Sequence, residues 1–313
     1  MSDPVERHSE VRVAAEEGVM ATVTELDVIE ATGADAANYL HGQLSQNVER
    51  LTDGETRWTL LLQPQGKIDA WMRIHRVDPE RFLLVVDSGF GPTAQTRLDR
   101  FKLRVDAAFN TTTRPALALR GPGSAELART LASGSPVTVV AADWGGPGCD
   151  LVAEPGAESV IGELLAVLPE SAVRGSARSL EMVRVLRGQP AMGSELDGST
   201  IPAAAGVVEE SVDFTKGCYV GQELVARVDS RGSNTPTNLV RLLLSAQSNE
   251  LTAGLQLELD GTVIGTVTSV APSATADQAV GLGYVKRGVE VPGSAHLIVD
   301  GRVVEVALRP LRN

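Results

Sequence analysis

The chain has 313 residues, of which 43% are hydrophobic and 22% are charged, and its formal net charge at pH 7 is −12. This size and composition predict a globular protein of two or three domains. The negative charge and the low aromatic content of 4% argue against binding to nucleic acid, which needs clustered cations or stacking platforms.

The two cysteines are too few for a disulfide framework or for the four thiolates that hold an iron–sulfur cluster. Cys149 lies in a Gly/Pro-rich turn and is interpreted as structural. No run of 18 apolar residues predicts a transmembrane helix, and the polar N-terminus lacks the apolar region of a signal peptide. We therefore expect a cytoplasmic protein without a membrane partner.

The first part of the chain alternates predicted strands and helices. Residues 1–18 are polar and are expected to form a flexible leader. The hydrophobic pattern then predicts one strand, one helix, three strands and one helix, at residues 22–29, 33–44, 56–62, 68–77, 82–86 and 93–103. A similar arrangement follows, with strands at 116–119, 137–140 and 149–152 and helices near 121–131, 159–168 and 177–186. Because βαβ alternation is not strict, the pattern favours α+β layers over a doubly wound sheet.

The C-terminal part reads as strands only. Residues 230–237 have the composition of a linker. Beyond them, Asp260-Gly261 and Asp300-Gly301 each separate two alternating apolar runs, which is a strong signal for a tight hairpin. The sequence therefore predicts a small β-barrel at residues 236–313.

The octapeptide Lys216–Glu223 (KGCYVGQE) is the most informative segment for function. An ammonium next to Cys218 favours the thiolate, whereas the alternative is a buried cysteine that acts as a small hydrophobe. Lys216 is either this activating cation or an exposed, solvated lysine. Tyr219 is more typical of a core or cleft wall than of a catalyst.

The octapeptide resembles the K-G-C-(Y/F)-x-G-Q-E signature of the YgfZ-type folate-binding proteins, which are relatives of the aminomethyltransferase T-protein. The resemblance implies two intertwined α+β domains, at about 19–112 and 113–235, and a C-terminal barrel, arranged as a three-lobed cloverleaf around a central folate site. It also implies a monomer that takes part in iron–sulfur cluster biogenesis or repair. Its partners would be a folate and iron–sulfur client enzymes or assembly factors.

Two stretches resemble transferase motifs but depart from them. The turn with Lys67 and Asp69 is similar to the G-G-x-x-D-D turn of aminomethyltransferases, with Asp69 at the first acid and Ala70 at the second. Residues 144–151 are similar to Y-T-G-E-D-G-x-E-I, but the acid that grips the pterin falls on Gly146, while Asp150 keeps the later acidic position. By residue type alone, the first stretch is a hairpin turn with Lys67 and Asp69 solvated, and the second is a β-turn before a strand. The lost acids argue against transferase chemistry and leave folate binding open.

Single basic residues complete the candidate site. Arg184 matches the arginine of the family's L-R-x-E-x-G segment, which faces the folate, and Arg227 matches another basic position of the family. Arg187 is interpreted as a partner of its helix dipole. His41 and His75 have no partner at metal-ligand spacing and are interpreted as structural, so no permanently bound metal is expected.

The leading hypothesis is a protein that binds tetrahydrofolate or a one-carbon derivative and serves iron–sulfur enzymes. Cys218 would act as a nucleophile, a redox-sensitive thiol or a transient cluster ligand, with Lys216 and Asp69 as the other catalytic candidates. The residues expected to bind the cofactor are Arg184, Lys216, Tyr219, Gln222, Glu223, Arg227 and Lys67. Two alternatives stay open. One is a tetrahydrofolate-dependent aminomethyltransferase or methyltransferase that uses Asp69, and the other is a non-catalytic scaffold.

Overall fold

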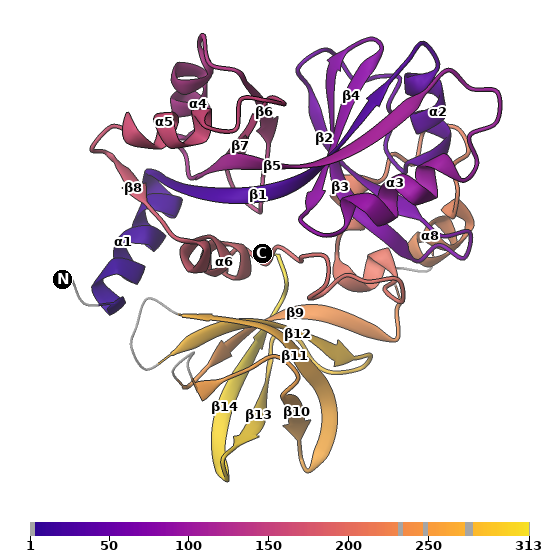
Figure 1. Cartoon of the computed structure of the whole chain (residues 1–313). Coiled ribbons are helices and arrows are strands. Elements are labelled where there is room, and N and C mark those ends of the chain that lie inside the picture. Colours follow the sequence, from indigo (N-terminus) through magenta and orange to yellow (C-terminus); the bar gives the residue numbers. More distant parts are fainter. Residues whose placement is uncertain (1–3, 231–233, 247–249, 273–277, 313) are drawn as a thin grey trace.

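The computed structural model describes residues 4–230, 234–246, 250–272 and 278–312. The chain forms an α+β region on one large curled sheet, and a closed β-barrel lies below it (Figure 1). The expected α+β class and the C-terminal barrel are confirmed.

One sheet runs through the whole α+β region. Its order is β2-β3-β4-β1-β5-β7-β6, and β8 pairs in parallel with the beginning of β1. Its strands are β1 (Val19–Thr32), β2 (Thr56–Leu62), β3 (Ile68–Asp78), β4 (Arg81–Asp87), β5 (Ala108–Arg120), β6 (Val137–Ala141), β7 (Gly148–Ala153) and β8 (Ala172–Arg174). β1 pairs with β5 along nearly its entire length, and its second half also pairs with β4. The boundary expected at residues 112 and 113 lies inside β5, so the two lobes share their central strands.

Helices cover the two ends of this sheet separately. The helices are α1 (Pro4–Glu17), α2 (Ala36–Gln43), α3 (Gly91–Asp99), α4 (Ser124–Ala132), α5 (Val160–Ala166), α6 (Ala177–Leu186), α7 (Val208–Ser211) and α8 (Gln222–Asp229), with a 3-10 turn at Pro202–Ala205. Leu40 of α2 and Leu98 of α3 belong to one buried core, whereas Leu131 of α4 and Ile161 of α5 belong to another. α6 lies between the sheet and the barrel and contacts both (Figure 1). Among the described residues, no helix is long and apolar enough to cross a membrane.

The expectation of a flexible leader at residues 1–18 is wrong for the part that the structure describes. Residues 4–17 form α1, and its side chains Val11, Ala14 and Ala15 are buried. Two of these residues are alanines, which bury a helix face without a strong hydrophobic signal. The carbonyl of Ala15 also accepts a hydrogen bond from Arg187 Nη2 at 2.7 Å, which ties α1 to the end of α6.

The barrel has six strands in the order β10-β11-β12-β9-β14-β13. They are β9 (Thr237–Leu244), β10 (Gln256–Leu259), β11 (Thr262–Pro272), β12 (Ala279–Lys286), β13 (Gly293–Val299) and β14 (Arg302–Arg309). Asp260 and Gly261 have φ values of 50° and 72°, and Asp300 and Gly301 have 48° and 76°. Positive φ at both central residues is the geometry that a two-residue hairpin needs, so both predicted hairpins are confirmed. The expected linker at 230–237 lies partly outside the described residues.

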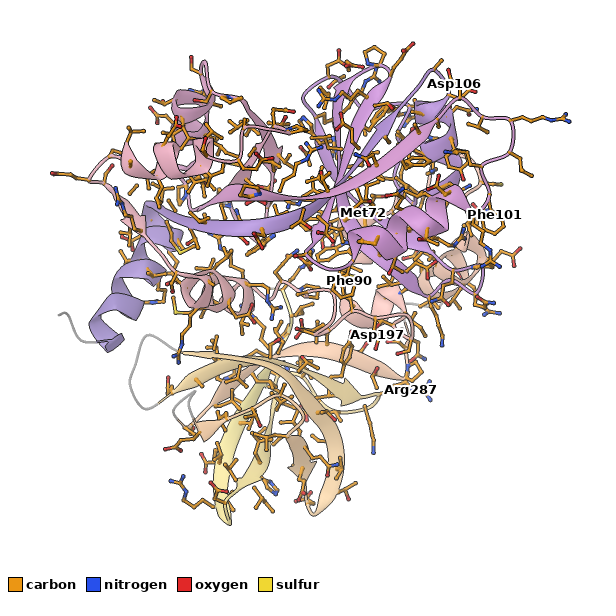
Figure 2. All side chains as sticks on the ribbon, viewed as in Figure 1. Met72, Phe90, Phe101, Asp106, Asp197 and Arg287 are labelled. Carbon is orange, nitrogen blue, oxygen red and sulfur yellow. The ribbon has the colours of Figure 1, made fainter. Side chains whose placement is uncertain are left out.

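Side chains fill the junction between the two bodies. Figure 2 shows Phe90 and Asp197 in the region where the sheet meets the barrel. Leu239 and Leu282 of the barrel share a buried cluster with Met182 and Val183 of α6. This continuous apolar contact holds the barrel against the underside of the sheet.

Replacement of Val11 by Asp tests whether α1 is docked. Val11 is 1% exposed, so an unpaired carboxylate there should release the helix and lower the melting temperature by roughly 5 °C. Val13→Asp is the matched control, because Val13 is 42% exposed on the same helix. Thermal unfolding and limited trypsin cleavage at Arg12 measure the difference. Equal behaviour of the two variants would mean that α1 is not packed in solution.

Candidate functional site

Two adjoining cavities lie beneath the sheet, at the side where α6 and the segment after it cross. Their volumes are about 50 Å³ and 270 Å³, and they share the wall residues Leu26, Asp87, Trp144, Arg184 and Ala191. All three tryptophans of the chain line one cavity or both. An apolar, aromatic cavity with a few converging polar groups is typical of a small-molecule site.

Neighbouring strands position two of the tryptophans. Trp58 on β2 and Trp71 on β3 are diagonal neighbours across an antiparallel pair, and their rings stack at 4.1 Å with an interplanar angle of 17°. Trp71 Nε1 donates to Ser211 Oγ at 2.8 Å, which fixes the ring orientation. The stacked pair therefore forms a rigid wall of the smaller cavity.

A buried triad of charges, Arg73, Arg120 and Asp150, also lines the cavities. Arg73 Nη1 and Arg120 Nη1 lie 2.7 and 2.8 Å from the two oxygens of Asp150. Burial alone would raise the pKa of Asp150, but the two guanidinium groups hold it below its usual value. Arg120 also covers the ring of Trp144 at 3.9 Å. The retained acid Asp150 is thus committed to two arginines, and the triad leaves one positive charge in excess.

Asp87 and Gln189 are cavity residues that the sequence did not single out. Asp87 follows the apolar run of β4, and its Oδ2 accepts a hydrogen bond from the backbone N–H of Met192 at 2.9 Å. Burial raises the pKa of Asp87, against the opposing effect of the Met192 N–H and two nearby arginines. Gln189 is 2% exposed, and its Nε2 has no hydrogen-bond partner among the described residues. A carboxylate at the end of an apolar strand was the available signal for Asp87.

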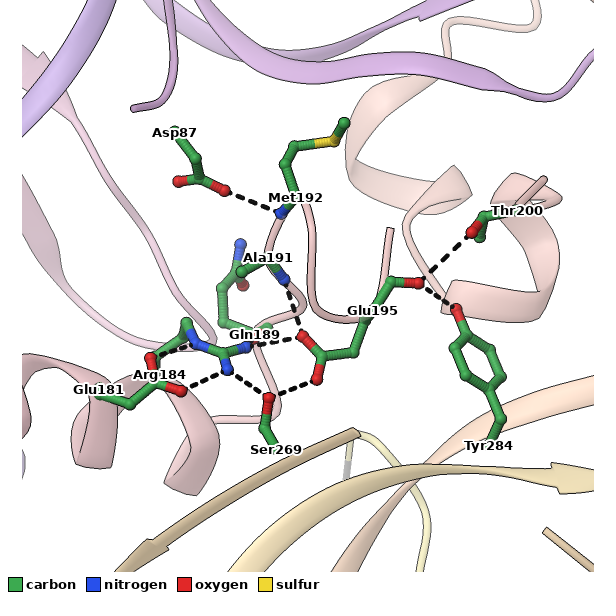
Figure 3. Close-up of polar contacts among 10 residues, drawn as sticks. All are labelled: Asp87, Glu181, Arg184, Gln189, Ala191, Met192, Glu195, Thr200, Ser269 and Tyr284. Atoms are coloured by element: carbon green, nitrogen blue, oxygen red, sulfur yellow. Dashed lines mark hydrogen bonds and ion pairs between the residues drawn. The ribbon is translucent and has the colours of Figure 1, made fainter. Parts of the chain in front are cut away.

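Arg184 lines both cavities, but all five of its N–H groups are used within the chain (Figure 3). Its Nε and Nη2 donate to Glu181 at 2.7 and 2.6 Å, and Nη1 donates to Glu195 at 2.9 Å and to the carbonyl of Gln189 at 2.6 Å. The remaining Nη2 hydrogen reaches Ser269 Oγ of the barrel at 2.7 Å. Despite burial, its acidic partners raise the pKa of Arg184. No donor is left for a folate carboxylate, so in this structure Arg184 joins α6 to the barrel.

Lys216 caps a helix and does not aim its protons at the thiol. Its Nζ donates to the backbone carbonyls of His41, Leu44 and Gln46, with the last two at 2.6 and 3.0 Å. The first two carbonyls lie at the C-terminal end of α2, where cations are favoured, and that of Gln46 follows shortly after it. The same burial lowers the pKa of Lys216 to about 8. The three contacts use all three ammonium protons, which corrects the expectation of a cation that activates Cys218.

The octapeptide and the turn with Lys67 pack backbone against backbone. Gly66 has a φ of 75° and Gly221 a φ of 83°. A Cβ on Gly221 would lie 2.5 Å from the carbonyl oxygen of Gln63, and a Cβ on Gly66 would lie 2.5 Å from Leu224 Cβ. Only glycine fits at both positions. Two motifs that are about 150 residues apart in the sequence therefore form one rigid unit, which presents Cys218 at the surface.

The remaining candidates lie on this unit and away from the cavities. Asp69 forms an ion pair with Arg97 at 3.1 Å, and Ala70 is fully buried in β3. Tyr219 packs against the core, and burial raises its pKa to about 12. Gln222 Oε1 accepts from the Tyr219 N–H at 3.1 Å. Lys67 is half-buried, and Glu223 and Arg227 are exposed.

The structure therefore divides the expected cofactor-binding set into two places. Arg184 lines the cavities, but none of the other six expected residues does so among the side chains that the structure describes. Gly146 lies next to a basic side chain, because a Cβ on Gly146 would be 3.3 Å from the guanidinium carbon of Arg187. Arg187 itself donates to the carbonyls of Gly146 and Pro147, in addition to that of Ala15.

Cys149, His75 and His41, which were interpreted as structural from the sequence, contact other parts of the chain. Cys149 is buried, its Sγ lies 3.6 Å from the carbonyl of Ser124, and burial raises its pKa to about 12. His75 is buried and shares a hydrogen bond of 2.9 Å with Thr56. His41 gives its carbonyl to Lys216. Within the described parts of the chain, no three His, Cys, Asp or Glu side chains are grouped to hold a metal.

Replacement of Lys216 by Met should change the pH dependence of stability. The pKa of Lys216 is about 8 in the folded protein and 10.5 in its ordinary state, so the unfolded chain binds more protons between these values. The free energy of unfolding of the wild type should therefore rise, relative to Lys216→Met, as the pH increases from about 8 to 10. Urea unfolding at several pH values measures this difference. Parallel pH profiles for the two proteins would contradict the assignment.

Replacement of Gly221 by Ala should disturb the octapeptide, whereas Gly217→Ala should not. Gly221 combines a left-handed backbone with a 2.5 Å clash, which predicts a loss of about 1–3 kcal/mol in the free energy of unfolding. The nearest atom to a Cβ on Gly217 is His41 Nε2 at 4.0 Å, so this variant is the matched control. Chemical denaturation compares the two. Similar losses in both variants would argue against the close packing.

Two protein-family models match the chain, and both describe domains of the glycine cleavage T-protein. Residues 5–145 match the GCVT N-terminal domain, and residues 238–311 match the glycine cleavage T-protein C-terminal barrel domain. A protein of Haemophilus influenzae named only as an uncharacterized protein is 27% identical over 252 residues, which cover 79% of this chain and 82% of that protein. An aminomethyltransferase of Streptomyces coelicolor is 27% identical over 330 residues and covers 95% of this chain and 86% of the enzyme.

A solved structure of an aminomethyltransferase has a similar fold. The crystal structure of glycine cleavage system aminomethyltransferase T from Bartonella henselae matches with a TM-score of 0.81. The match covers 97% of this chain and 88% of that one, at 19% sequence identity. Both domain models and the shared fold lead to one assignment. The chain belongs to the superfamily of the glycine cleavage T-protein, the aminomethyltransferase-like proteins.

Proposed function

We propose that the protein binds tetrahydrofolate, or a one-carbon derivative of it, in the two central cavities. Membership of the aminomethyltransferase-like superfamily implies this ligand class. The observation that carries the proposal is the gathering of all three tryptophans around the cavities, together with Asp87 and Gln189. Flat aromatic walls and a few fixed polar groups suit a planar heterocycle.

We further propose that the protein serves the biogenesis, maintenance or repair of iron–sulfur enzymes through Cys218. The octapeptide that resembles the YgfZ-type signature is intact. Its thiol is exposed on a unit that the contact between Gly66 and Gly221 makes rigid. This exposure supports a reaction or contact with a client protein, and the position outside the cavities supports separate places for the thiol and the folate. The clients would be iron–sulfur enzymes or their assembly factors.

The second candidate is a tetrahydrofolate-dependent aminomethyltransferase. The relative from Streptomyces coelicolor, which covers 95% of this chain, is the observation that favours it. Against it, Ala70 is a buried side chain without an acid, Asp69 is paired with Arg97, and Gly146 lies beside Arg187. An assay of methylene-tetrahydrofolate formation from an aminomethyl donor decides the question, and absence of turnover removes this candidate.

Complementation tests the role of Cys218. Cells that lack the protein should recover the activity of a 4Fe–4S enzyme when they express the wild type, and recovery should fall at least severalfold with Cys218→Ala. Because Cys218 is exposed, this variant should fold as the wild type does. Cys149→Ala is the control for loss of a cysteine that has no proposed role.

Three results would count against parts of this proposal. Equal recovery with Cys218→Ala would assign the cysteine no chemical role and favour the scaffold. Absence of any effect of the wild type would contradict the iron–sulfur function. Titration calorimetry of the purified protein with 5-formyltetrahydrofolate tests the ligand separately, and absence of binding would contradict the folate site.

A further inference from the structure

Two polar side chains face the smaller cavity with hydrogen-bonding capacity that the chain leaves unused. Asp87 uses Oδ2 for the Met192 N–H, and no partner of its Oδ1 is found in the described part of the protein. Gln189 is 2% exposed, yet its Nε2 is without a partner there. Figure 3 shows the amide of Gln189 directly below the carboxylate of Asp87. A carboxylate acceptor and an amide donor therefore line the same small cavity.

Arg73 and Arg184 are the cations near Asp87, and each of them pairs with other groups of the described chain. Arg184 gives all five N–H groups to Glu181, Glu195, Ser269 and the carbonyl of Gln189. Arg73 is bound to Asp150 and to the carbonyl of Ala141. Leaving a buried amide donor unpaired costs free energy of its own, which a bound ligand would recover. Both side chains are thus set to meet a ligand.

We propose that Asp87 and Gln189 together recognise the 2-amino-4-oxo edge of the bound ring, an inference that rests on the proposed folate binding. The 2-amino group and the N3–H are adjacent donors, which match the two sides of a carboxylate. The neighbouring 4-oxo group is an acceptor, which matches the N–H of Gln189. Pterins and guanine share this edge, so the chemistry by itself admits a folate or a guanine nucleoside.

The cavities fit this orientation of the ring. The smaller cavity, about 50 Å³, has room for an edge, and Asp87 and Gln189 both line it. The larger cavity, about 270 Å³, has room for the body of the ring and is lined by Asp87 but not by Gln189. Trp144 lines both cavities and offers an aromatic face, since Arg120 covers its ring at 3.9 Å on one side.

Asp87 also takes the place of the missing acid at residue 146. A carboxylate at that position would lie against the guanidinium of Arg187, which is 3.3 Å from the site of its Cβ. Such an acid would pair with Arg187 and would not be free for the ring. The carboxylate of Asp87, at the end of β4, is held by the backbone N–H of Met192 and not by an arginine side chain. It therefore stays available to the ring.

Titration calorimetry with three probes tests the assignment. The probes are 5-formyltetrahydrofolate, its 2-desamino analogue and guanosine. The wild type should bind 5-formyltetrahydrofolate at least tenfold more tightly than the 2-desamino analogue, because the analogue lacks one donor to a charged acceptor. This comparison needs no variant, so it does not depend on the folding of a mutant protein.

Variants then assign the contacts to residues. Asp87→Asn should weaken binding of 5-formyltetrahydrofolate at least tenfold and reduce its preference over the analogue to about twofold, since an amide cannot accept from both donors. Gln189→Leu should weaken both folates by the same factor. Glu170→Gln is the matched control, because Glu170 is an exposed carboxylate that lines neither cavity, and it should leave both affinities unchanged. Melting temperatures confirm that each variant is folded.

The possible outcomes separate the two proposals. If the wild type binds 5-formyltetrahydrofolate but does not distinguish the analogue, or if Asp87→Asn behaves as Glu170→Gln does, the role of Asp87 is overturned and folate binding stands. If guanosine binds and loses affinity in Asp87→Asn while 5-formyltetrahydrofolate does not bind, the edge recognition is supported and the folate proposal is overturned. If no probe binds to the wild type, both are overturned.

Discussion

The antiparallel pairing of β1 with β5 is the interaction on which the rest of the structure depends. It extends without a break from Met20 opposite Arg120 to Thr32 opposite Ala108. One end of β1 also pairs with β8, and the other end pairs with β4. Because β1 and β5 run through both lobes, the lobes cannot separate unless the hydrogen bonds between these two strands break. The cavities form below this pair, and Leu26 on β1 belongs to their common wall.

A buried ionic network fixes the second boundary of the cavities. Arg184 links α6, the segment that carries Gln189 and Glu195, and Ser269 of the barrel. Tyr284 of the barrel adds a hydrogen bond to the carbonyl of Glu195 at 3.0 Å. Removing one member of such a buried network leaves an uncompensated charge, which typically costs about 3–5 kcal/mol. The network thus holds the barrel at a set position below the cavities, while it withdraws Arg184 from ligand binding.

The secondary structure could be predicted well where periodicity or turn chemistry was local. The hairpins at Asp260-Gly261 and Asp300-Gly301 and the helix α6 at Ala177–Leu186 were found because two to ten residues suffice to encode them. The strands predicted at 22–29 and 116–119 were too short, since β1 and β5 extend to Val19–Thr32 and Ala108–Arg120. Their extra residues include several Thr and Ala and no alternating apolar pattern, and the pairing of the two strands makes them extended.

The candidate site could be predicted in its motifs but not in its assembly. The sequence pointed to the octapeptide and to the turn with Asp69, and the structure places both in one unit. It did not point to Trp58, Trp71, Asp87 or Gln189, because the segments that carry them meet only through the sheet and the crossing of α6. Nearness in sequence also misled, since Lys216 turns to the end of α2 and away from a role beside Cys218.

By itself, the sequence determined the α+β class, the barrel with its two hairpins, and the superfamily that the octapeptide suggested. These properties depend on residues that are close together in the chain, where the preferences of side chains for φ and for burial act directly. Only the tertiary structure decided which side chains surround the cavities, which cations are already paired, and which acceptors and donors remain free. Many of these facts depend on contacts between distant residues, such as Arg120 with Asp150, 30 positions apart, and Lys216 with Leu44, 172 positions apart. Such contacts exist only after the elements have packed together.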